Sequence, residues 1–171
     1  MRRPRVAILG VTGAVGQEFL SILEQRNFPL QSLKLLASKK SAGKKVKFCG
    51  QDYTIEEARP DSFKDIDLVL SSAGGAVSRE LVPHAVKAGA LVVDNTSAFR
   101  MDPEVPLVVP EINPQDIQKH KGIIANPNCS TIVMLMPLYP IDKKNRIKRV
   151  IVSTYQAASG AGAKAMRELE T

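Results

Sequence analysis

Cys129 has the surroundings that best suit covalent chemistry in this sequence. It lies in the segment NPNCST, directly before the apolar run Thr131–Leu138, which predicts a helix. A thiolate at a helix N-terminus is stabilised by the helix dipole, and the free amides there can form an oxyanion hole. We therefore expect Cys129 to be a nucleophile and Asn128 to orient the substrate. The alternative is a buried structural cysteine, the common fate of a lone Cys.

A glycine-rich turn near the N-terminus predicts a nucleotide site. The glycines of GVTGAVG are spaced by three, follow the apolar run Val6–Leu9 and open the helical spacing of Ala14–Gln25. Glycines allow a tight turn close to a pyrophosphate, and the helix N-terminus supplies amides and partial positive charge. A plain strand-to-helix turn is the alternative. The residues expected to cradle the pyrophosphate are Gly10, Val11, Thr12, Gly13, Ala14, Val15 and Gly16.

The segment after the second predicted strand, Leu33–Ala37, bears on the choice of cofactor. NAD enzymes usually place an acid there to hold the ribose hydroxyls, whereas this chain continues with SKKSAGKK. Lysines and hydroxyls suit a 2′-phosphate, which predicts NADP, and a solvated lysine loop is the alternative. The expected contacts are Ser38, Lys39, Lys40, Ser41 and Lys44, and the small residues Ser72, Ala73 and Gly74 are expected to let the cofactor pass close to the backbone.

Alternating strands and helices are expected to bring these groups to one edge of a sheet. Apolar runs predict strands at Val6–Leu9, Leu33–Ala37, Asp67–Ala73, Leu91–Asn95 and Gly122–Ala125. Helices are predicted at Ala14–Gln25 and Ser78–Ala88, and a hairpin at Val46–Phe48 and Tyr53–Ile55 with Cys49 in its turn. Strands apolar on both faces indicate a parallel sheet covered by helices. The predicted fold class is α/β: a Rossmann-like, doubly wound, mostly parallel sheet.

The last part of the chain predicts the beginning of a second, α+β domain. A loop at Arg100–Pro114 with a short strand in Pro106–Pro110 leads to the Cys129 segment. We expect a helix that ends before Pro140, a turn at Asp142–Arg146, a strand at Ile147–Ala157 and a helix that runs on without a stop signal. One strand and one helix cannot bury a core of their own, so residues 147–171 are expected to pack poorly.

The composition narrows the class of protein. The chain has 171 residues, 44% of them hydrophobic, a net charge of +7 and 2 Cys. So few cysteines argue against a disulfide framework and indicate the reducing cytoplasm. Neither a signal peptide nor an apolar stretch near the roughly 20 residues of a membrane span is visible. Because the basic residues fall in two separate clusters, neither nucleic acid nor a membrane is expected as a partner, and no metal site is expected.

Five motifs, in order, resemble the bacterial aspartate-semialdehyde dehydrogenases: GVTGAVG, LASKKSAGK, VVDNTSAFRMDPEVPLVVPEIN, NPNCST and VSTYQAASGAG. This resemblance covers essentially the whole chain. It implies NADP-dependent, reversible conversion of aspartate semialdehyde and phosphate to aspartyl phosphate through a cysteine thioester. That reaction serves lysine (through diaminopimelate), threonine and methionine biosynthesis. It also implies a homodimer or homotetramer, with residues 1–130 as the NADP-binding domain and 131–171 as the incomplete start of a catalytic and dimerisation domain.

The resemblance also implies individual roles. Cys129 would form the thioester, Arg100 would bind phosphate, and Asn95 and Asn128 would line the substrate pocket. Gln156 would contact the substrate near the thiol. The residues implied to approach the nicotinamide are Ser159 and Gly160.

The chain departs from the family pattern at two points. Lys40 stands where the family often has Arg, and neither His84 nor His120 matches the motif of the general-base histidine. Without that histidine and the arginine for the substrate carboxylate, this chain alone is not expected to turn over. The alternatives are a short form that only binds NADP or a full-length partner, an N-acetyl-glutamyl-phosphate reductase, and a basic nucleic-acid module.

Overall fold

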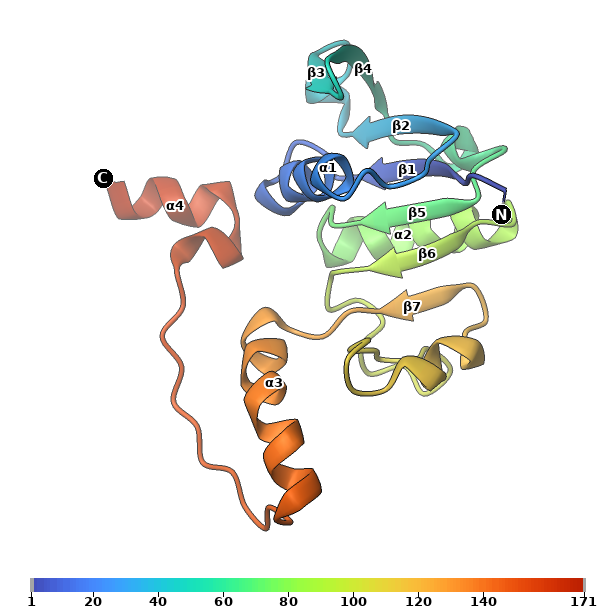
Figure 1. Ribbon diagram of the computed structural model, residues 1–171. Helices are drawn as coiled ribbons and strands as arrows, with labels where there is room; N and C mark the ends of the chain where they lie inside the picture. Colours follow the sequence, from blue (N-terminus) through green and yellow to red (C-terminus); the bar gives the residue numbers. More distant parts are fainter. Residues whose placement is uncertain (1, 171) are drawn as a thin grey trace.

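A seven-stranded sheet forms the centre of the computed structural model, which describes residues 2–170 (Figure 1). The strand order is β3-β4-β2-β1-β5-β6-β7, and every pair is parallel except the β3–β4 hairpin. The predicted Rossmann-like, mostly parallel sheet is therefore confirmed. The strands are β1 Arg5–Leu9, β2 Ser32–Ala37, β3 Lys45–Phe48, β4 Gln51–Glu57, β5 Leu68–Ser71, β6 Leu91–Asp94 and β7 Ile123–Ala125.

Helices cover both faces of this sheet, because strand residues alternate between two cores. Helix α1 (Ala14–Gln25) packs over the side chains of Val6 and Ile8, while α2 (Gly75–Lys87) packs over those of Ala7 and Leu9. In Figure 1, α1 lies in front of the sheet and α2 behind it. The three short helices of this part are η1 Lys39–Ser41, η2 Pro60–Phe63 and η3 Pro114–Lys119.

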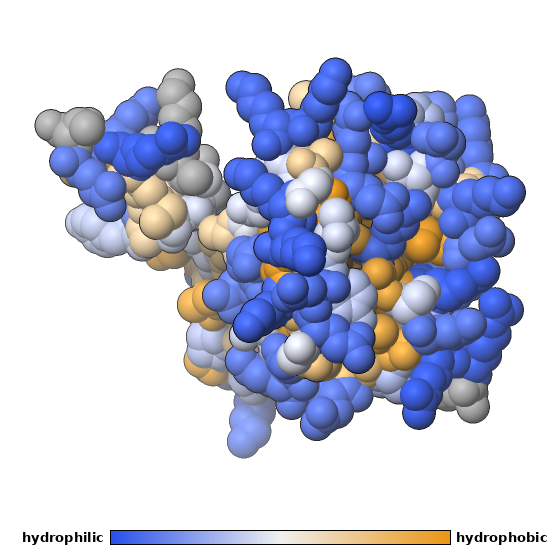
Figure 2. Space-filling view, turned by 90° about the horizontal axis from the view of Figure 1, so that it is seen from above, coloured by the Kyte–Doolittle hydropathy of each residue, from blue (hydrophilic) through white to orange (hydrophobic). Residues whose placement is uncertain are grey.

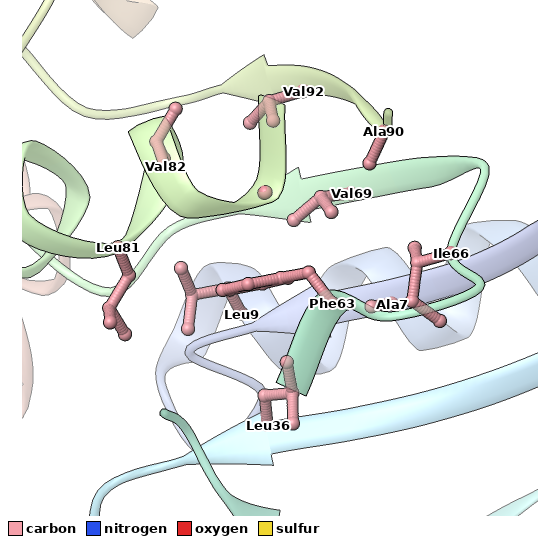
Figure 3. Packing of buried hydrophobic residues seen from close by; sticks show 11 residues of the cluster. Ala7, Leu9, Leu36, Phe63, Ile66, Val69, Leu81, Val82, Ala90 and Val92 are labelled. Carbon is pink, nitrogen blue, oxygen red and sulfur yellow. The ribbon is translucent and has the colours of Figure 1, made fainter. Parts of the chain in front are cut away.

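Phe63 anchors η2 in the core on the α2 side. Its side chain is fully buried, and in Figure 3 it lies close to Leu9, Leu36 and Ala7. Burial of an aromatic ring of this size is among the larger single contributions to folding. The η2 segment, which follows β4, is therefore fixed against the sheet near the carboxyl ends of β1 and β2.

The arrangement around β1 creates the point at which such folds bind ligands. Strand β1 pairs with β2 on one side and β5 on the other, and the connections through α1 and α2 run on opposite faces. A crevice opens where the strand order reverses in this way, outside the carboxyl ends of the strands. In Figure 1 all the parallel strands point towards the side on which the C-terminal helices lie.

Helix α3 (Cys129–Lys144) contains the predicted run Thr131–Leu138 but begins earlier, at Cys129, and runs further. The prediction that it ends before Pro140 is wrong, because Pro137 and Pro140 both lie inside it. The predicted surface turn at Asp142–Arg146 is partly replaced by its last residues. A proline removes only its own N–H and disfavours helix mainly for the residue before it, so the turns after it can still form. Pro83 is accommodated inside α2 in the same way.

The predicted strand Ile147–Ala157 does not form. These residues have no regular structure, and they lead to η4 (Ala158–Ala161) and α4 (Ala163–Glu170). A strand needs a partner for its backbone groups, and residues 2–170 offer none at this place. In the same way, Pro106–Pro110 makes only an isolated bridge, Leu107 to Ala125.

The C-terminal segment packs as loosely as expected. Helix α3 contains no buried residue, and none of the side chains described from 147 to 170 is buried. Tyr155 is 100% exposed and Ile151 is 86% exposed. Figures 1 and 2 show α4 standing away from the body, whose visible face is mostly hydrophilic. Within residues 2–170 no helix is both long and apolar enough to cross a bilayer.

Candidate functional site

A cavity of about 480 Å³ opens at the carboxyl ends of β1, β2, β4 and β5. Seven residues expected at the cofactor line it: Gly10, Thr12, Gly13, Ser38, Lys39, Ser72 and Ala73. The other residues expected in the glycine turn, Val11, Ala14, Val15 and Gly16, lie beside the cavity rather than on its wall. Gly74 is likewise absent from the wall and forms the N-cap of α2.

The three glycines of the turn differ in what they make room for. A Cβ on Gly10 would meet the Ser72 carbonyl oxygen at 2.7 Å, and one on Gly16 would meet the Gly10 carbonyl oxygen at 2.3 Å. Both positions therefore require glycine for the packing of the protein itself. A Cβ on Gly13 would meet nothing closer than 3.4 Å. Space above the backbone at Gly13 thus lies open towards the cavity, as close approach of a pyrophosphate requires.

The N-terminus of α1 is prepared for an anion. Gly13 is its N-cap, no side chain caps it, and its first turn contains no acidic residue. The first amides of a helix have no partner inside the helix and carry the positive end of its dipole. Together with the open space at Gly13, these amides fit the phosphates of a dinucleotide.

The lysine-rich segment after β2 meets the cavity with its first residues. Ser38 and Lys39 line the wall, whereas Lys40 and Ser41 lie further along η1 and do not. A role of Lys40 and Ser41 at a 2′-phosphate stays a prediction.

Three charged residues of the cavity wall were not expected from the sequence: Glu57, Arg59 and, in α2, Glu80. Glu57 and Arg59 escaped prediction because the predicted hairpin strand stopped at Ile55, whereas β4 continues to Glu57. The register pairs Ala37 of β2 with Glu57 of β4. The charged run after Ile55 is the signal that could have extended the strand.

Arg100 and Asn95, both expected at the substrate, meet at the loops after β6 and β7. The Arg100 Nε donates to the Asn126 carbonyl at 2.9 Å, and a terminal nitrogen donates to the Asn95 carbonyl at 3.0 Å. The Asn126 amide donates to the Asn95 side-chain oxygen at 2.6 Å. Backbone carbonyls thus hold the guanidinium in place, and its remaining donors suit an anion.

A buried polar network below this loop was also missed. The fully buried Asp94 carboxylate accepts from the Ser78 hydroxyl at 3.2 Å, from the Thr96 amide at 2.9 Å and from the Thr96 hydroxyl at 2.9 Å. Ser71 joins it through a hydroxyl contact with Ser78 of 3.1 Å. Asp94 therefore ties α2 and β5 to the loop that carries Arg100. An acid that ends an apolar run is the signal that points to it.

Cys129 occupies the first turn of α3, as predicted. The Asn128 side-chain oxygen caps the helix and accepts from the amides of Ser130 at 3.0 Å and Thr131 at 3.4 Å. The thiol is exposed and donates to the Gln156 side-chain oxygen at 3.9 Å. The alternative of a buried structural cysteine is therefore wrong, and the structure brings Asn128, Cys129 and Gln156 together.

The surroundings of the thiol form a second depression, of about 360 Å³. It is lined by Cys129, Ser130, Val133, Met134, Thr154 and Tyr155, and it shares no residue with the first cavity. Ser159 and Gly160 lie in η4 and line neither, so their approach to the nicotinamide stays a prediction. Cys49 is exposed in the β3–β4 turn at a φ of 49°.

Neither histidine lines the depression around the thiol within the described chain. His120 accepts the Gly122 amide on its Nδ1 at 3.1 Å, and His84 belongs to the last turn of α2.

Two family models match the chain. The NAD binding domain of semialdehyde dehydrogenase matches residues 5–120, and the semialdehyde dehydrogenase dimerisation domain matches residues 136–171. Aspartate-semialdehyde dehydrogenase of Bacillus subtilis (strain 168) is 60% identical over 164 residues, which are 96% of this chain and 47% of the relative. The chain therefore spans about half the length of the curated relatives it matches.

Solved structures agree with these matches. Aspartate semialdehyde dehydrogenase II of Vibrio cholerae, complexed with ASA, has a TM-score of 0.95 at 45% identity, covering 99% of this chain and 51% of that chain. The aspartate semialdehyde dehydrogenase of Candida albicans with NADP has a TM-score of 0.74 at 31% identity, covering 84% of this chain and 48% of that chain.

Proposed function

The chain belongs to the semialdehyde dehydrogenase family, and on that premise we propose that it supplies the cofactor site and the nucleophile of an NADP-dependent aspartate-semialdehyde dehydrogenase. The reaction would convert aspartate semialdehyde and phosphate reversibly to aspartyl phosphate, for lysine, threonine and methionine biosynthesis. The observation that carries the proposal is the exposed Cys129 thiol at the capped N-terminus of α3, beside Gln156.

Cys129 would act by forming and then losing one bond to carbon. Its thiolate attacks the aldehyde carbon, and the oxygen that becomes negative meets the amides at the start of α3. Bound NADP⁺ would accept the hydride that leaves this carbon, which turns the adduct into a thioester. Phosphate then attacks the thioester carbon, the C–S bond breaks, and the thiolate is released with the acyl phosphate.

Other residues would bind and orient. Arg100, held by two backbone carbonyls, would bind the phosphate through its free donors. Asn95, Asn128 and Gln156 would line the substrate pocket, the last through its amide beside the thiol. Gly10, Thr12, Gly13 and the first amides of α1 fit the pyrophosphate, and Ser38 with the lysines after it fits the 2′-phosphate.

We further propose residues 1–130 as the cofactor domain and 131–171 as the start of the catalytic and dimerisation domain, in a homodimer or homotetramer. The match to a dimerisation domain and the exposed apolar side chains of this part support the assembly. Two free cysteines, one of them a nucleophile, fit the cytoplasm. We propose that residues 1–171 alone bind nucleotide without turnover, since neither His84 nor His120 lines the depression around the thiol.

The test is phosphate-dependent reduction of NADP⁺ by aspartate semialdehyde, run beside an intact-mass measurement of the protein assayed. Cys129→Ser should abolish the activity of an active protein, whereas Cys49→Ser should leave it unchanged. Activity retained in Cys129→Ser would reject Cys129 as the nucleophile.

Alkylation tests the thiol without needing turnover. Both cysteines are exposed, so accessibility alone would give similar rates with iodoacetamide. We expect Cys129 to react faster at neutral pH, because it is the first residue of α3, at the positive end of the helix dipole, whereas Cys49 lies in a hairpin turn. Peptide mass spectrometry over time gives both rates, and equal rates would count against an activated thiol.

A further inference from the structure

An ion pair stands on the wall of the cofactor cavity. The Arg59 guanidinium donates to one carboxylate oxygen of Glu57, from Nε at 3.0 Å and from a terminal nitrogen at 2.6 Å. Both residues line the cavity together with Ser38 and Lys39, the residues that follow β2. A negative and a positive side chain thus share the place where a nucleotide would put its adenosine ribose.

Glu57 lies beside the position at which NAD enzymes carry their ribose-binding acid. That acid normally follows β2. Here Glu57 is paired in register with Ala37, the last residue of β2, and the next amide, of Ala58, donates to the Ala37 carbonyl at 2.8 Å. Neighbouring strands are about 4.8 Å apart. The cavity therefore holds an acid near the expected place, although the segment after β2 has none.

The backbone that carries the pair is held firmly. The Arg59 amide donates to the Ser62 hydroxyl at 3.0 Å, the Ser62 amide donates to the Arg59 carbonyl at 3.0 Å, and the Ser62 hydroxyl donates to the Glu57 carbonyl at 3.3 Å. Phe63, the next residue, is fully buried in the core (Figure 3). Pre-organised backbone of this kind presents its side chains at fixed points.

The side chains themselves remain free to exchange partners. The Arg59 side chain is 65% exposed and that of Glu57 is 28% exposed. Ion pairs with this much solvent contact contribute little to stability, typically below about 1 kcal/mol. A phosphate can therefore recruit the guanidinium at small cost, and the planar guanidinium suits two parallel hydrogen bonds to phosphate oxygens.

We propose that Glu57 and Arg59 form a charge pair that determines the preference for NADP over NAD. Arg59 neutralises Glu57, so that the acid does not repel a 2′-phosphate, and adds its own donors to that phosphate. With Arg59 removed, the free Glu57 carboxylate accepts from a ribose 2′-hydroxyl and repels the phosphate. This inference rests on the nucleotide site proposed above and assigns to it two residues outside the lysine-rich segment.

Four proteins test the pair: the parent chain, Arg59→Met, Glu57→Gln and the double variant. The fluorescence of bound NADPH and NADH gives both dissociation constants directly, and the chain contains no Trp to interfere. Arg59→Met should lower the preference for NADPH by about 10- to 100-fold, the range of a lost charge-assisted hydrogen bond with added repulsion. The double variant should regain part of that preference, because the repelling carboxylate is gone.

A matched control exists on the same strand. Glu56 precedes Glu57, forms its own ion pair with Lys34 at 3.3 Å and does not line the cavity. Glu56→Gln should leave both dissociation constants unchanged. Thermal unfolding of every variant should stay near the parent, since the exchanged side chains are not part of the core.

The outcomes separate the pair from the site. Parent-like preference in Arg59→Met would overturn the inference while leaving the nucleotide site intact. If Arg59→Met and the double variant showed the same preference, Glu57 would have no effect on the choice of nucleotide. That result would also overturn the inference of a charge pair. A parent chain that binds neither nucleotide would overturn the proposed site itself, and the pair with it.

Discussion

Residues 5–127 and residues 129–170 differ in how their apolar side chains are used. The first region buries them in two cores on either side of a sheet. The second contains helix α3, which is rich in apolar residues but has no buried residue. It is followed by a segment in which Ile151 and Tyr155 are almost fully exposed. The cofactor cavity belongs to the first region and the thiol to the second.

This difference shows which part of the candidate site is held in place by the fold of its own region. The cavity wall is built from strand ends, from η2 and from α2, all anchored by buried residues such as Phe63 and Leu36. The thiol has a fixed helix cap, but Gln156 reaches it from a segment without regular structure. Exposed apolar surface of this extent is typical of an interface, in agreement with the match to a dimerisation domain.

Two substitutions by alanine, one in each region, should show the largest difference between the regions. Phe63→Ala should lower the free energy of unfolding by about 3–5 kcal/mol, because it leaves a large cavity in the core. Ile151→Ala, at a position 86% exposed, should change it by no more than about 0.5 kcal/mol. Urea unfolding followed by circular dichroism measures both. Similar losses in the two variants would break the distinction between the regions.

Two aspartates extend the comparison to polar groups. Asp94→Ala should cost about 2–4 kcal/mol, since buried donors of Ser78 and Thr96 lose their acceptor. Asp94→Asn should cost less, because the amide keeps one acceptor oxygen. Asp142 also accepts two hydrogen bonds, from Arg146 and Ile147, but its side chain is 33% exposed, so Asp142→Ala should cost about 1 kcal/mol or less. Equal urea midpoints for Asp94→Ala and Asp142→Ala would contradict this order.

Shortening the chain tests whether the two regions are coupled. A protein that ends at Asn145 lacks residues 146–171, among which no described side chain is buried. Its sheet should unfold with a free energy within about 1 kcal/mol of the parent. Nucleotide binding should persist, because the removed residues do not line the cofactor cavity. A much lower unfolding midpoint would show that the segment supports the sheet.

The smallest expected effect is a pH dependence confined to the first region. Arg5 donates to Asp67 through its side chain and its amide, and these hydrogen bonds hold the pKa of Asp67 well below its usual value. The stabilisation is therefore complete above the unfolded pKa of about 3.9 and is lost as the pH falls towards the folded pKa. The urea midpoint of the parent should fall more between about pH 6 and pH 3 than that of Asp67→Asn. Identical slopes would mean that solvent screens the pair completely.

What the sequence predicts well is local. The glycine spacing identifies the β1–α1 turn because the physical demands on Gly10 and Gly16 arise from residues within that turn and its neighbours. Helix α1 has the predicted bounds, and Cys129 stands at the predicted helix start, because capping depends on adjacent residues such as Asn128. The strands of the sheet are also predicted from local sequence, because each is a short run of adjacent apolar residues.

What escapes prediction depends on residues far apart in the chain. The strand expected at Ile147–Ala157 has the right composition, but a strand exists only with a partner. The Glu57–Arg59 pair faces the cavity because β4 lies beside β2, an adjacency that no local pattern encodes. Asp94 also escapes prediction, since its carboxylate oxygens accept hydrogen bonds from Ser78 of α2 and from Thr96 in the loop after β6.

The hydrogen bonds that hold the Arg100 guanidinium have a consequence for mutagenesis. The two groups that accept from its guanidinium are main-chain carbonyls of Asn95 and Asn126, which every amino acid at those positions would provide. An alanine scan would therefore record the loss of the Asn side chains while leaving both acceptors in place, and it would understate how strongly the arginine is oriented. Because any amino acid at these two positions supplies the same carbonyl, substitutions there in homologues leave both acceptors of the Arg100 guanidinium in place. If the acceptors were side chains, such substitutions would remove them.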